Sequence, residues 1–495
     1  MAFYSATLVG VKPIPVEIEI DISPGLPFFQ IVGLPDAVLR ESKTRVKSAI
    51  LQSGFEFPYD QRVVLNLAPS EVKKEGSGFE LGLAARILTS SNQVSNPDFN
   101  ILFLGELALD GKIRSIPEVE ALAYSAHSHF SGGVKLDLIV VSEADVSKIS
   151  QLKIKVLGLR HLCDLKLQNW WSVDFPLTVG SSSTTDPQRP VCQYSPEIGD
   201  RKNADLSTQF EKLRFSEFWG RHLMIAALGG HHYFLCGPPG TGKTFFAESL
   251  RTVLSLLSDG LEVERRLLNS IFKRSPMELP FAAPHHSASM AGILGGGNPP
   301  RAGAVTRTHG GILFLDELLE FSTSSLDGLR EPVERGVVEI FRAGSQVTFP
   351  SRFQLVAATN PCRCGYWKDK TNACRCMPHI RKAYLGRMSG PFFERFDVKI
   401  FCERRKGNEK LVSGKEILSK IGRIKTQDFK PRWTPSVSKL LDEKADKGQF
   451  NLRTFEKVKK LCFTLAQIDG QPSITPKIIT EATRYQAFGG LDRPF

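Results

Sequence analysis

Long apolar runs and cysteines are scarce in this chain, and each shortage excludes a class of protein. No stretch approaches the roughly 18 uncharged apolar residues of a membrane span. The first residues, Met1-Ala2-Phe3, carry neither a basic leader nor an apolar signal core. Nine cysteines in 495 residues are too sparse for a disulfide scaffold. We therefore expect a cytoplasmic protein in a reducing compartment, without a membrane partner.

An acidic surplus is also missing, and the basic charge is unevenly placed. The formal net charge is +12, and residues 403–460 hold 17 Lys and Arg against 8 Asp and Glu. Such an excess suits a polyanion such as DNA or RNA, although a set of solvated helix faces would give the same count.

The length and the local patterns predict a multi-domain α/β protein with four parts. Residues 1–175 alternate strand-like runs with amphipathic helix-like segments, which indicates an α/β or α+β domain. Residues 176–209 turn to Ser, Thr, Pro and Asp, as a linker does. A second α/β domain with a parallel sheet is expected over 210–402, followed by a basic helical domain over 403–495.

Eight consecutive residues match the P-loop pattern. They follow an apolar strand at 233–236 and open a helix-like run at 245–257, which is the context that the motif requires. A glycine turn without a nucleotide is the alternative. In a P-loop, backbone N–H groups surround the phosphates, the lysine reaches the outer phosphates and the threonine ligates Mg²⁺. The predicted ATP-binding residues are Gly237, Pro238, Pro239, Gly240, Thr241, Gly242, Lys243 and Thr244.

Two further apolar strands end in polar residues. The run 311–315 leads to Asp316 and Glu317, and the run 355–359 leads to Asn360. Because ligands of α/β proteins bind at the carboxyl ends of parallel strands, we expect these side chains beside the P-loop. Asp316 is predicted to hold the Mg²⁺ shell, Glu317 to polarise the attacking water and Asn360 to orient it.

Together these motifs resemble the magnesium-chelatase-like branch of the AAA+ ATPases, and within it the ComM/YifB group. Arg395, in Glu-Arg-Phe-Asp, is similar to the arginine finger, whose guanidinium suits the γ-phosphate of a neighbouring subunit. Arg453 is similar to the sensor-2 arginine. The resemblance spans nearly the whole chain and implies a P-loop AAA+ core, a helical lid, ATP with Mg²⁺, and a ring-forming homo-oligomer, which we expect to be a hexamer.

The resemblance also implies a function. A hexameric DNA motor is expected, which drives branch migration of joint molecules during homologous recombination or natural transformation and acts on branched or single-stranded DNA. Two alternatives stay open. One is a chelatase motor subunit that inserts Mg²⁺ into a tetrapyrrole with a large partner subunit, and the other is a protein remodeller that uses its N-terminal domain to bind adaptors.

A β-hairpin is predicted between the strands that end at Asp316 and Asn360. Residues 338–342 and 346–349 flank a three-residue loop that contains Gly344. In related ring helicases a hairpin at this place projects into the pore and contacts nucleic acid. Arg342 is therefore the candidate DNA phosphate contact, and a solvated hairpin charge is the alternative.

The N-terminal domain resembles the Lon-protease-like domain of ComM-type proteins. The alignment with that family's loop puts Gly78 where the nucleophilic serine belongs and Glu120 where the activating lysine belongs. A Ser–Lys mechanism needs a hydroxyl beside a desolvated amine, so we predict no protease activity. Ser77 is the one hydroxyl that a register shift of one residue would bring into place. An assembly and substrate-contact domain is expected instead.

Four cysteines cluster after the predicted strand that leads to Asn360, as two CxC pairs. Four thiolates at this spacing could bind one tetrahedral Zn²⁺, and unligated thiols around a loop are the alternative. We expect a structural zinc. Its ligands would be Cys362, Cys364, Cys374 and Cys376.

Overall fold

The computed structural model divides the chain into two compact units. The N-terminal unit comprises residues 1–195 and 266–276, and the second unit comprises 196–265 and 277–495. Of the predicted linker, residues 176–205 lie outside the part of the chain that the structure describes. The described residues are 2–127, 131–150, 152, 154–167, 169–172, 206–257, 263–275, 278–298, 300–342, 345–404, 409–426, 431–446 and 452–486.

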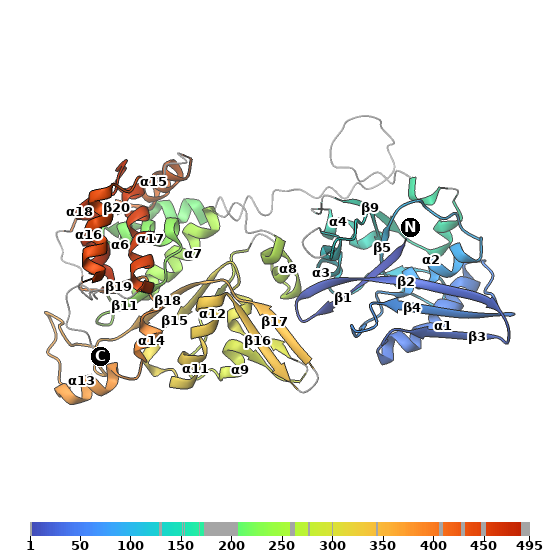
Figure 1. Ribbon diagram of the computed structural model, residues 1–495, viewed down its shortest axis with the longest axis horizontal. Coiled ribbons are helices and arrows are strands. Elements are labelled where there is room, and N and C mark those ends of the chain that lie inside the picture. Colours follow the sequence, from blue (N-terminus) through green and yellow to red (C-terminus); the bar gives the residue numbers. More distant parts are fainter. Residues whose placement is uncertain are drawn as a thin grey trace. The chain divides into compact units, whose positions relative to one another are not determined.

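A seven-stranded mixed sheet forms the N-terminal unit (Figure 1). Its order is β3-β4-β2-β1-β5-β8-β9, with β2 antiparallel to β1 and to β4 and the other neighbours parallel. In β4, Val63, Leu65 and Leu67 are buried at every second position, as expected for a strand with one covered face. The strands are β1 (Phe3–Val9), β2 (Lys12–Pro24), β3 (Phe28–Val32), β4 (Gln61–Ala68), β5 (Ile101–Leu104), β8 (Leu138–Ser142), β9 (Lys155–Leu159) and the short pair β6 (Glu106–Leu107) and β7 (Ile113–Arg114).

Two helices contribute side chains to the core beside this sheet. Helix α1 (Ala37–Gln52) begins after Asp36, whose carboxylate accepts a hydrogen bond from the backbone N–H of Leu39 at 2.7 Å. Helix α2 (Glu80–Ser90) is buried along almost its whole length and packs against α1, β2 and β5. The shorter helices are α3 (Val119–Ala123) and α4 (Val146–Ile149).

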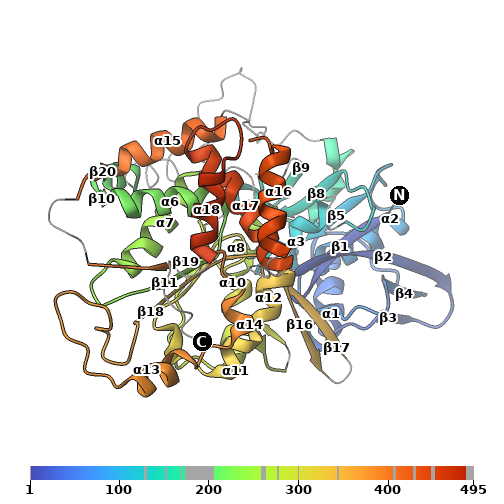
Figure 2. The same ribbon diagram turned by 60° about the vertical axis from the view of Figure 1, so that its left-hand side comes forward.

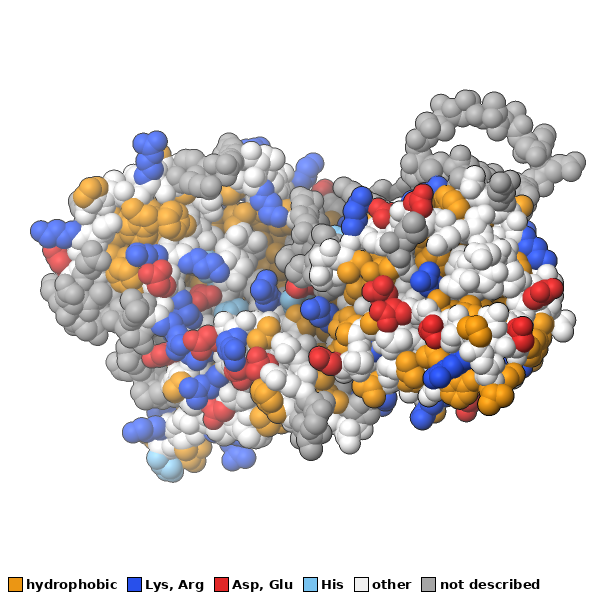
Figure 3. All heavy atoms as spheres, turned by 45° about the vertical axis from the view of Figure 1, so that its right-hand side comes forward, with side chains coloured by type: hydrophobic (Ala, Val, Ile, Leu, Met, Phe, Trp, Pro, Cys, Tyr) orange, Lys and Arg blue, Asp and Glu red, His pale blue; other side chains and the backbone are white. Residues whose placement is uncertain are grey.

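The surface of the N-terminal unit does not favour one sign of charge on the face that Figure 3 brings forward. Acidic and basic side chains are interspersed there with apolar ones. This face therefore gives no electrostatic reason to place a polyanion on the N-terminal unit.

A five-stranded parallel sheet in the order β12-β15-β18-β11-β19 is the centre of the second unit. All four residues of β15 and all six of β18 are buried, because helices cover both faces of such a sheet. The strands are β11 (Tyr233–Cys236), β12 (Phe281–Ala282), β15 (Ile312–Leu315), β18 (Gln354–Thr359) and β19 (Val398–Phe401).

Helices from both ends of the second unit share one hydrophobic core with this sheet (Figures 1 and 2). Helix α6 (Glu217–Gly229) packs against α7 (Lys243–Leu257) and against two C-terminal helices. The C-terminal helices are α15 (Gly414–Thr426), α16 (Pro435–Asp446), α17 (Leu452–Ile468) and α18 (Pro476–Gln486). The predicted boundary between core and lid at residue 402 stays a prediction, since both stretches lie in one compact unit.

Short helices and two-stranded pairs connect the strands of the parallel sheet. The helices are α9 (Met290–Leu294), α10 (Ala304–Arg307), α11 (Thr323–Gly328), α12 (Arg330–Arg335), α13 (Pro378–Leu385) and α14 (Gly390–Phe393). Helix α8 (Val263–Ile271) includes residues that are assigned to both units. The pairs are β10 (Arg214–Ser216) with β20 (Leu411–Ser413), β13 (Gly295–Gly296) with β14 (Arg301–Ala302), and β16 (Val337–Arg342) with β17 (Ser345–Pro350).

The predicted mixed α/β class with a parallel sheet is confirmed. Among the described residues, no helix combines the length and the apolar character that crossing a membrane requires.

Candidate nucleotide-binding site

The predicted P-loop joins β11 to α7 and depends on its glycines. Gly240 and Gly242 have φ of 76° and 91°, a conformation that residues with a Cβ rarely adopt. A Cβ on Gly237 would lie 2.4 Å from the carbonyl oxygen of Cys402, just after β19. A Cβ on Gly242 would lie 3.4 Å from the indole nitrogen of Trp219 on α6. Backbone conformation and close packing therefore both select glycine in this loop.

Lys243 is buried at the first turn of α7 and points its amine into the loop. Its Nζ donates hydrogen bonds to the carbonyl oxygens of Gly237 at 2.7 Å and Pro238 at 2.9 Å, and lies 3.4 Å from Oδ1 of Asn360. Burial lowers the pKa of Lys243, and the nearby acidic groups, Asp316 among them, partly offset this effect. The amine is thus desolvated, and phosphate oxygens are acceptors of the kind that it needs.

The strand β15 brings Asp316 to the threonine of the P-loop. The Thr244 hydroxyl donates a hydrogen bond to Oδ2 of Asp316 at 3.1 Å. A hydroxyl and a carboxylate next to a phosphate-binding loop are the oxygen ligands that Mg²⁺ takes from proteins, with water and substrate phosphates completing its shell. The donor set therefore fits the Mg²⁺–ATP that the sequence predicts.

Glu317 turns away from the strand in a left-handed conformation. Its φ is 50°, and its backbone N–H donates to Oδ1 of Asp316 at 2.9 Å. Its carboxylate lies 3.5 Å from Nδ1 of His286, on the loop between β12 and α9. A non-glycine residue held at positive φ is a strained conformation of the kind that concentrates at functional sites. His286 is not among the site residues that the sequence predicts.

Asn360 follows β18 and lies between Lys243 and the loop of the four cysteines. A Cβ added to Gly365 would lie 2.9 Å from Cδ of Pro239 and 3.9 Å from Cγ of Asn360. The cysteine loop therefore packs against both the P-loop and Asn360, which the sequence did not predict.

Arg395 and Arg453 form a second cluster, centred on Glu334 of α12. Nη2 of Arg395 donates to Oε2 of Glu334 at 2.6 Å, and Nη2 of Arg453 contacts Oε1 of the same carboxylate. Arg395 is 7% exposed, and burial, together with the charge of Arg453, lowers its pKa. The structure brings the two predicted arginines together, and Glu334 is a residue that the sequence reasoning missed.

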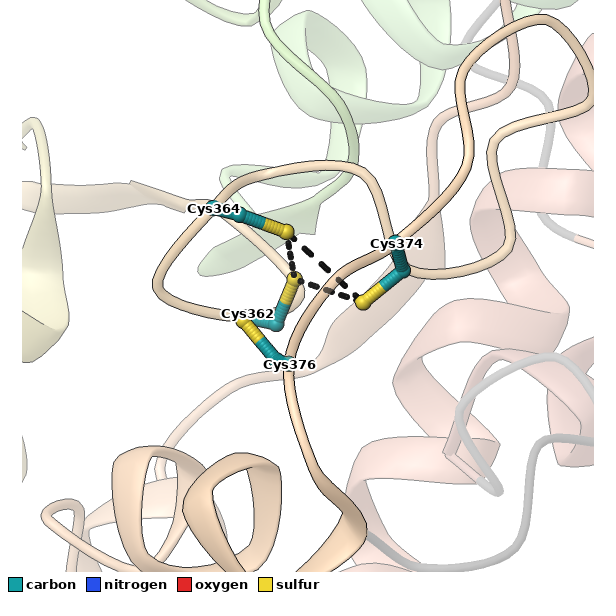
Figure 4. A group of neighbouring side chains, drawn as sticks. All are labelled: Cys362, Cys364, Cys374 and Cys376. Atoms are coloured by element: carbon teal, nitrogen blue, oxygen red, sulfur yellow. Dashed lines mark hydrogen bonds between the residues drawn. The ribbon is translucent and has the colours of Figure 1, made fainter.

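The four cysteines face one another on one loop after β18 (Figure 4). The Sγ atoms of Cys362, Cys364 and Cys374 are 3.3, 3.7 and 3.7 Å apart, and all four sulfurs lie within 4.8 Å of one another. Zn–S bonds of about 2.3 Å in a tetrahedron place sulfurs about 3.8 Å apart. Hydrogen bonds from the N–H groups of Tyr366 and Arg375 outweigh burial and lower the pKa of Cys364. The cluster is compatible with the predicted zinc.

The predicted hairpin is formed by β16 and β17. Its register pairs Ile340 with Val347 and Phe341 with Gln346. Ile340 is buried, whereas Phe341 is 64% exposed on the opposite face near the tip. The side chain of Arg342 lies outside the described residues. Its role as a DNA contact stays a prediction, and the exposed Phe341 was not predicted.

Gly78 and Glu120 occupy the positions that align with the serine and the lysine of the Lon-protease family. A Cβ on Gly78 would lie 2.9 Å from Cδ1 of Ile116, so this position is tightly packed. The Ser77 hydroxyl donates to Oε2 of Glu106 at 2.6 Å, and Glu120 lies on α3. The described contact of Ser77 is thus with a carboxylate and not with an amine.

The order of the parallel sheet, the loop at its carboxyl edge and the helices around it define an α/β protein of the AAA+ type. Residues 210–410 match the magnesium chelatase subunit ChlI family, and residues 18–136 match a second family of the same subunit. The chain therefore belongs to the magnesium-chelatase-like family, and relatives that are 31% identical over nearly its whole length assign it to the YifB/ComM group.

Two relatives illustrate this membership, and a third is similar to part of the chain. An uncharacterized protein of Escherichia coli, YifB, is 31% identical over 99% of this chain and 97% of its own length. The competence protein ComM of Haemophilus influenzae is 31% identical over 98% of this chain and 97% of its own length. The probable DNA helicase MCM9 of Oryza sativa is 25% identical over 42% of this chain and 27% of its own length. The family implies ATP and Mg²⁺ as ligands.

Proposed function

We propose that the protein is a ring-forming, ATP-driven DNA motor whose activity is branch migration in homologous recombination or natural transformation. The observation that carries the ATPase part is the convergence of Lys243, Thr244, Asp316 and Asn360 at one sheet edge. The DNA part rests on the hairpin and on the competence and helicase relatives.

The residues at the sheet edge divide the chemistry of ATP hydrolysis between them. The loop N–H groups and Lys243 hold the phosphates, and Asn360 together with Glu317 orients a water for in-line attack. Glu317 accepts a hydrogen bond from that water and takes its proton, while the water oxygen bonds to the γ-phosphorus and the bond from the γ-phosphorus to ADP breaks. Thr244 and Asp316 would hold Mg²⁺, which neutralises charge on the phosphate oxygens when it is bound.

The second cluster supplies the reason for a ring. Arg395 and Arg453 both contact Glu334. Among the described residues, neither arginine is hydrogen-bonded to the P-loop of the same chain. We propose that Arg395, which is similar to the arginine finger, acts on the γ-phosphate of a neighbouring copy and that Arg453 acts beside it. A closed homo-oligomer gives every site such a neighbour, and we propose a hexamer.

The hairpin formed by β16 and β17 supports the contact with DNA. Phe341 is exposed beside Arg342 near its tip. A base can stack on an exposed aromatic ring, and an arginine can bind the adjacent phosphate. The C-terminal helices add local basic charge that favours the same polyanion.

Two finer assignments belong to the same proposal. The cysteine loop would hold one structural Zn²⁺ through Cys362, Cys364, Cys374 and Cys376, and a bound zinc would fix the loop that packs against Asn360. The N-terminal unit would be a Lon-like domain without protease activity, used for assembly or substrate contact. The predicted lid, residues 403–495, would close over the nucleotide.

The test is ATP hydrolysis by the full chain without DNA, with a single strand and with a four-way junction. We expect stimulation by DNA, greatest with the junction, and its loss in Lys243→Ala. A direct assay of junction migration then follows. Equal turnover in all three conditions would overturn the DNA part and leave the ATPase part standing.

A chelatase motor subunit is the second candidate, because residues 210–410 match the subunit ChlI family. It predicts turnover that is insensitive to DNA and that changes when a large partner subunit and a tetrapyrrole are added. Stimulation by a protein substrate alone would point to a protein remodeller.

A further inference from the structure

Glu334 lies near the end of the short helix α12. Its carboxylate is shared between two arginines from different parts of the chain. Oε2 accepts from Arg395, which follows α14, at 2.6 Å, and Oε1 is in contact with Arg453 of α17. Each oxygen thus serves one guanidinium group, and one side chain ties together three elements.

The two guanidinium groups would repel each other without this carboxylate. Arg395 is 7% exposed, and both its burial and the charge of Arg453 lower its pKa, while the charge of Glu334 raises it. Nη1 of Arg395 is 3.4 Å from the Pro391 carbonyl, which is a weak contact. Glu334 is therefore the charged partner that keeps the two arginines side by side.

The backbones around the two arginines are fastened independently of Glu334. Nζ of Lys457, one turn after Arg453 on α17, donates to the carbonyl oxygens of Glu394 at 2.7 Å and Arg395 at 2.6 Å. It also lies 3.1 Å from Oδ1 of Asp397. Lys457 thus holds α17 against the backbone of residues 394–395. Glu334 instead fixes the direction of the side chains of Arg395 and Arg453.

We propose that Glu334 is a positioning residue that holds Arg395 and Arg453 as one paired donor for a terminal phosphate on a second copy of this chain. The inference rests on the proposed ATPase function and not on the proposed DNA function. Guanidinium groups bind carboxylates and phosphates through the same planar arrays of N–H donors. Two such groups held on one carboxylate leave their remaining donors directed together, with little reorganisation when a phosphate arrives.

The opposite role for Glu334 makes the opposite prediction. A carboxylate that competed with the incoming phosphate would act as a brake, and its removal would accelerate hydrolysis. A positioning carboxylate accelerates hydrolysis when present, so its removal slows the reaction.

The experiment measures basal ATP hydrolysis of the assembled full-length protein without DNA, together with its affinity for a fluorescent ATP analogue. In Glu334→Gln, which keeps the side-chain shape, kcat should fall about tenfold or more, a part of the roughly 10³- to 10⁵-fold that an arginine finger contributes. Affinity for the analogue should stay within about twofold, because the P-loop is untouched. Glu334→Asp, which keeps the charge, should restore part of kcat.

Two controls separate positioning from a general loss of structure. Glu331→Gln changes a carboxylate of the same helix that pairs with Arg335 at 2.7 Å, and it should leave kcat unchanged. In an Arg395→Ala background, Glu334→Gln should have little further effect, because the two residues act as a unit. Unchanged or faster hydrolysis in Glu334→Gln, or full additivity with Arg395→Ala, would overturn the proposal. DNA-insensitive turnover of the wild type would count against the DNA motor alone.

Discussion

Each unit of the molecule buries one lysine in a glycine-containing loop, and the two lysines differ in what surrounds them. Lys243 donates to two loop carbonyls and lies 3.4 Å from Asn360, with Thr244 and Asp316 hydrogen-bonded next to it. Lys74 is fully buried, and its Nζ donates to the carbonyl oxygen of Pro69. Burial lowers the pKa of both amines.

A desolvated amine is therefore not a catalytic site by itself. The amine of Lys243 can donate to a phosphate, and the oxygens of Thr244 and Asp316 beside it suit Mg²⁺. For Lys74, the described hydrogen bond is to its own loop, and the nearby Ser77 bonds to the carboxylate of Glu106. The surroundings of Lys243 thus suit the proposed nucleotide chemistry, whereas those of Lys74 suit a structural role. Substitutions and metal analysis can break or sharpen this difference.

The largest effect is expected for Lys243→Ala. The substitution removes the buried amine that would bind the phosphates at the P-loop. ATP hydrolysis should therefore fall below detection. Turnover and nucleotide affinity measured side by side check this. Lys74→Met is the matched control for a buried lysine and should keep full turnover; a comparable loss there would erase the distinction between the two loops.

Glu317→Gln should block hydrolysis while sparing binding. The amide keeps the shape of the side chain but cannot take a proton from water, and general-base catalysis is typically worth about 10²- to 10⁴-fold. Single-turnover kinetics and nucleotide affinity should separate the two steps. Glu320→Gln changes an exposed carboxylate that pairs with Arg387 at 3.1 Å and should behave as wild type. Weakened ATP binding in Glu317→Gln would contradict the assignment.

Metal analysis of the purified protein should find about one zinc per chain. Cys364→Ser should lower this content and loosen the loop against Asn360, so that kcat falls several-fold and the Tm drops. Cys163→Ser, in the N-terminal unit, is the cysteine control. A clean absence of zinc from an active protein would remove the metal from the proposal.

Lys74→Met should have the smallest effect, and that effect should depend on pH. Because the folded state lowers the pKa of Lys74 from its ordinary value of 10.5, the unfolded chain binds more protons between the two values. The wild type should therefore gain stability relative to Lys74→Met as pH rises through the lowered pKa toward 10.5. Thermal unfolding from pH 7 to 10 measures this difference, and parallel stability curves would show that the amine titrates normally.

The sequence predicted those features that local patterns encode. Parallel strands read as apolar runs, and the residues that follow them, such as Asp316 and Asn360, necessarily come to one edge of the sheet. The structure confirms the mixed α/β class, and the relatives confirm the family. The roles of the individual site residues remain predictions.

Contacts between distant segments could not be predicted in this way. Glu334 is 61 residues from Arg395 and 119 from Arg453, and no periodicity relates them. The packing of Gly365 against Pro239 likewise depends on how a loop folds back over the sheet edge. Phe341 is apolar at a position where the alternation of the strand calls for a polar residue. This departure from the pattern could have predicted an exposed phenylalanine.

Trp219 is positioned to report nucleotide binding through its intrinsic fluorescence. The indole lies on α6 against Gly242 of the P-loop, so a nucleotide that fills the loop changes the polarity around a natural fluorophore. Emission excited in the tryptophan band should shift on titration with ATP, and Trp219→Phe should remove the shift while the other four tryptophans still emit. Occupancy of the loop can then be followed in real time on unlabelled protein.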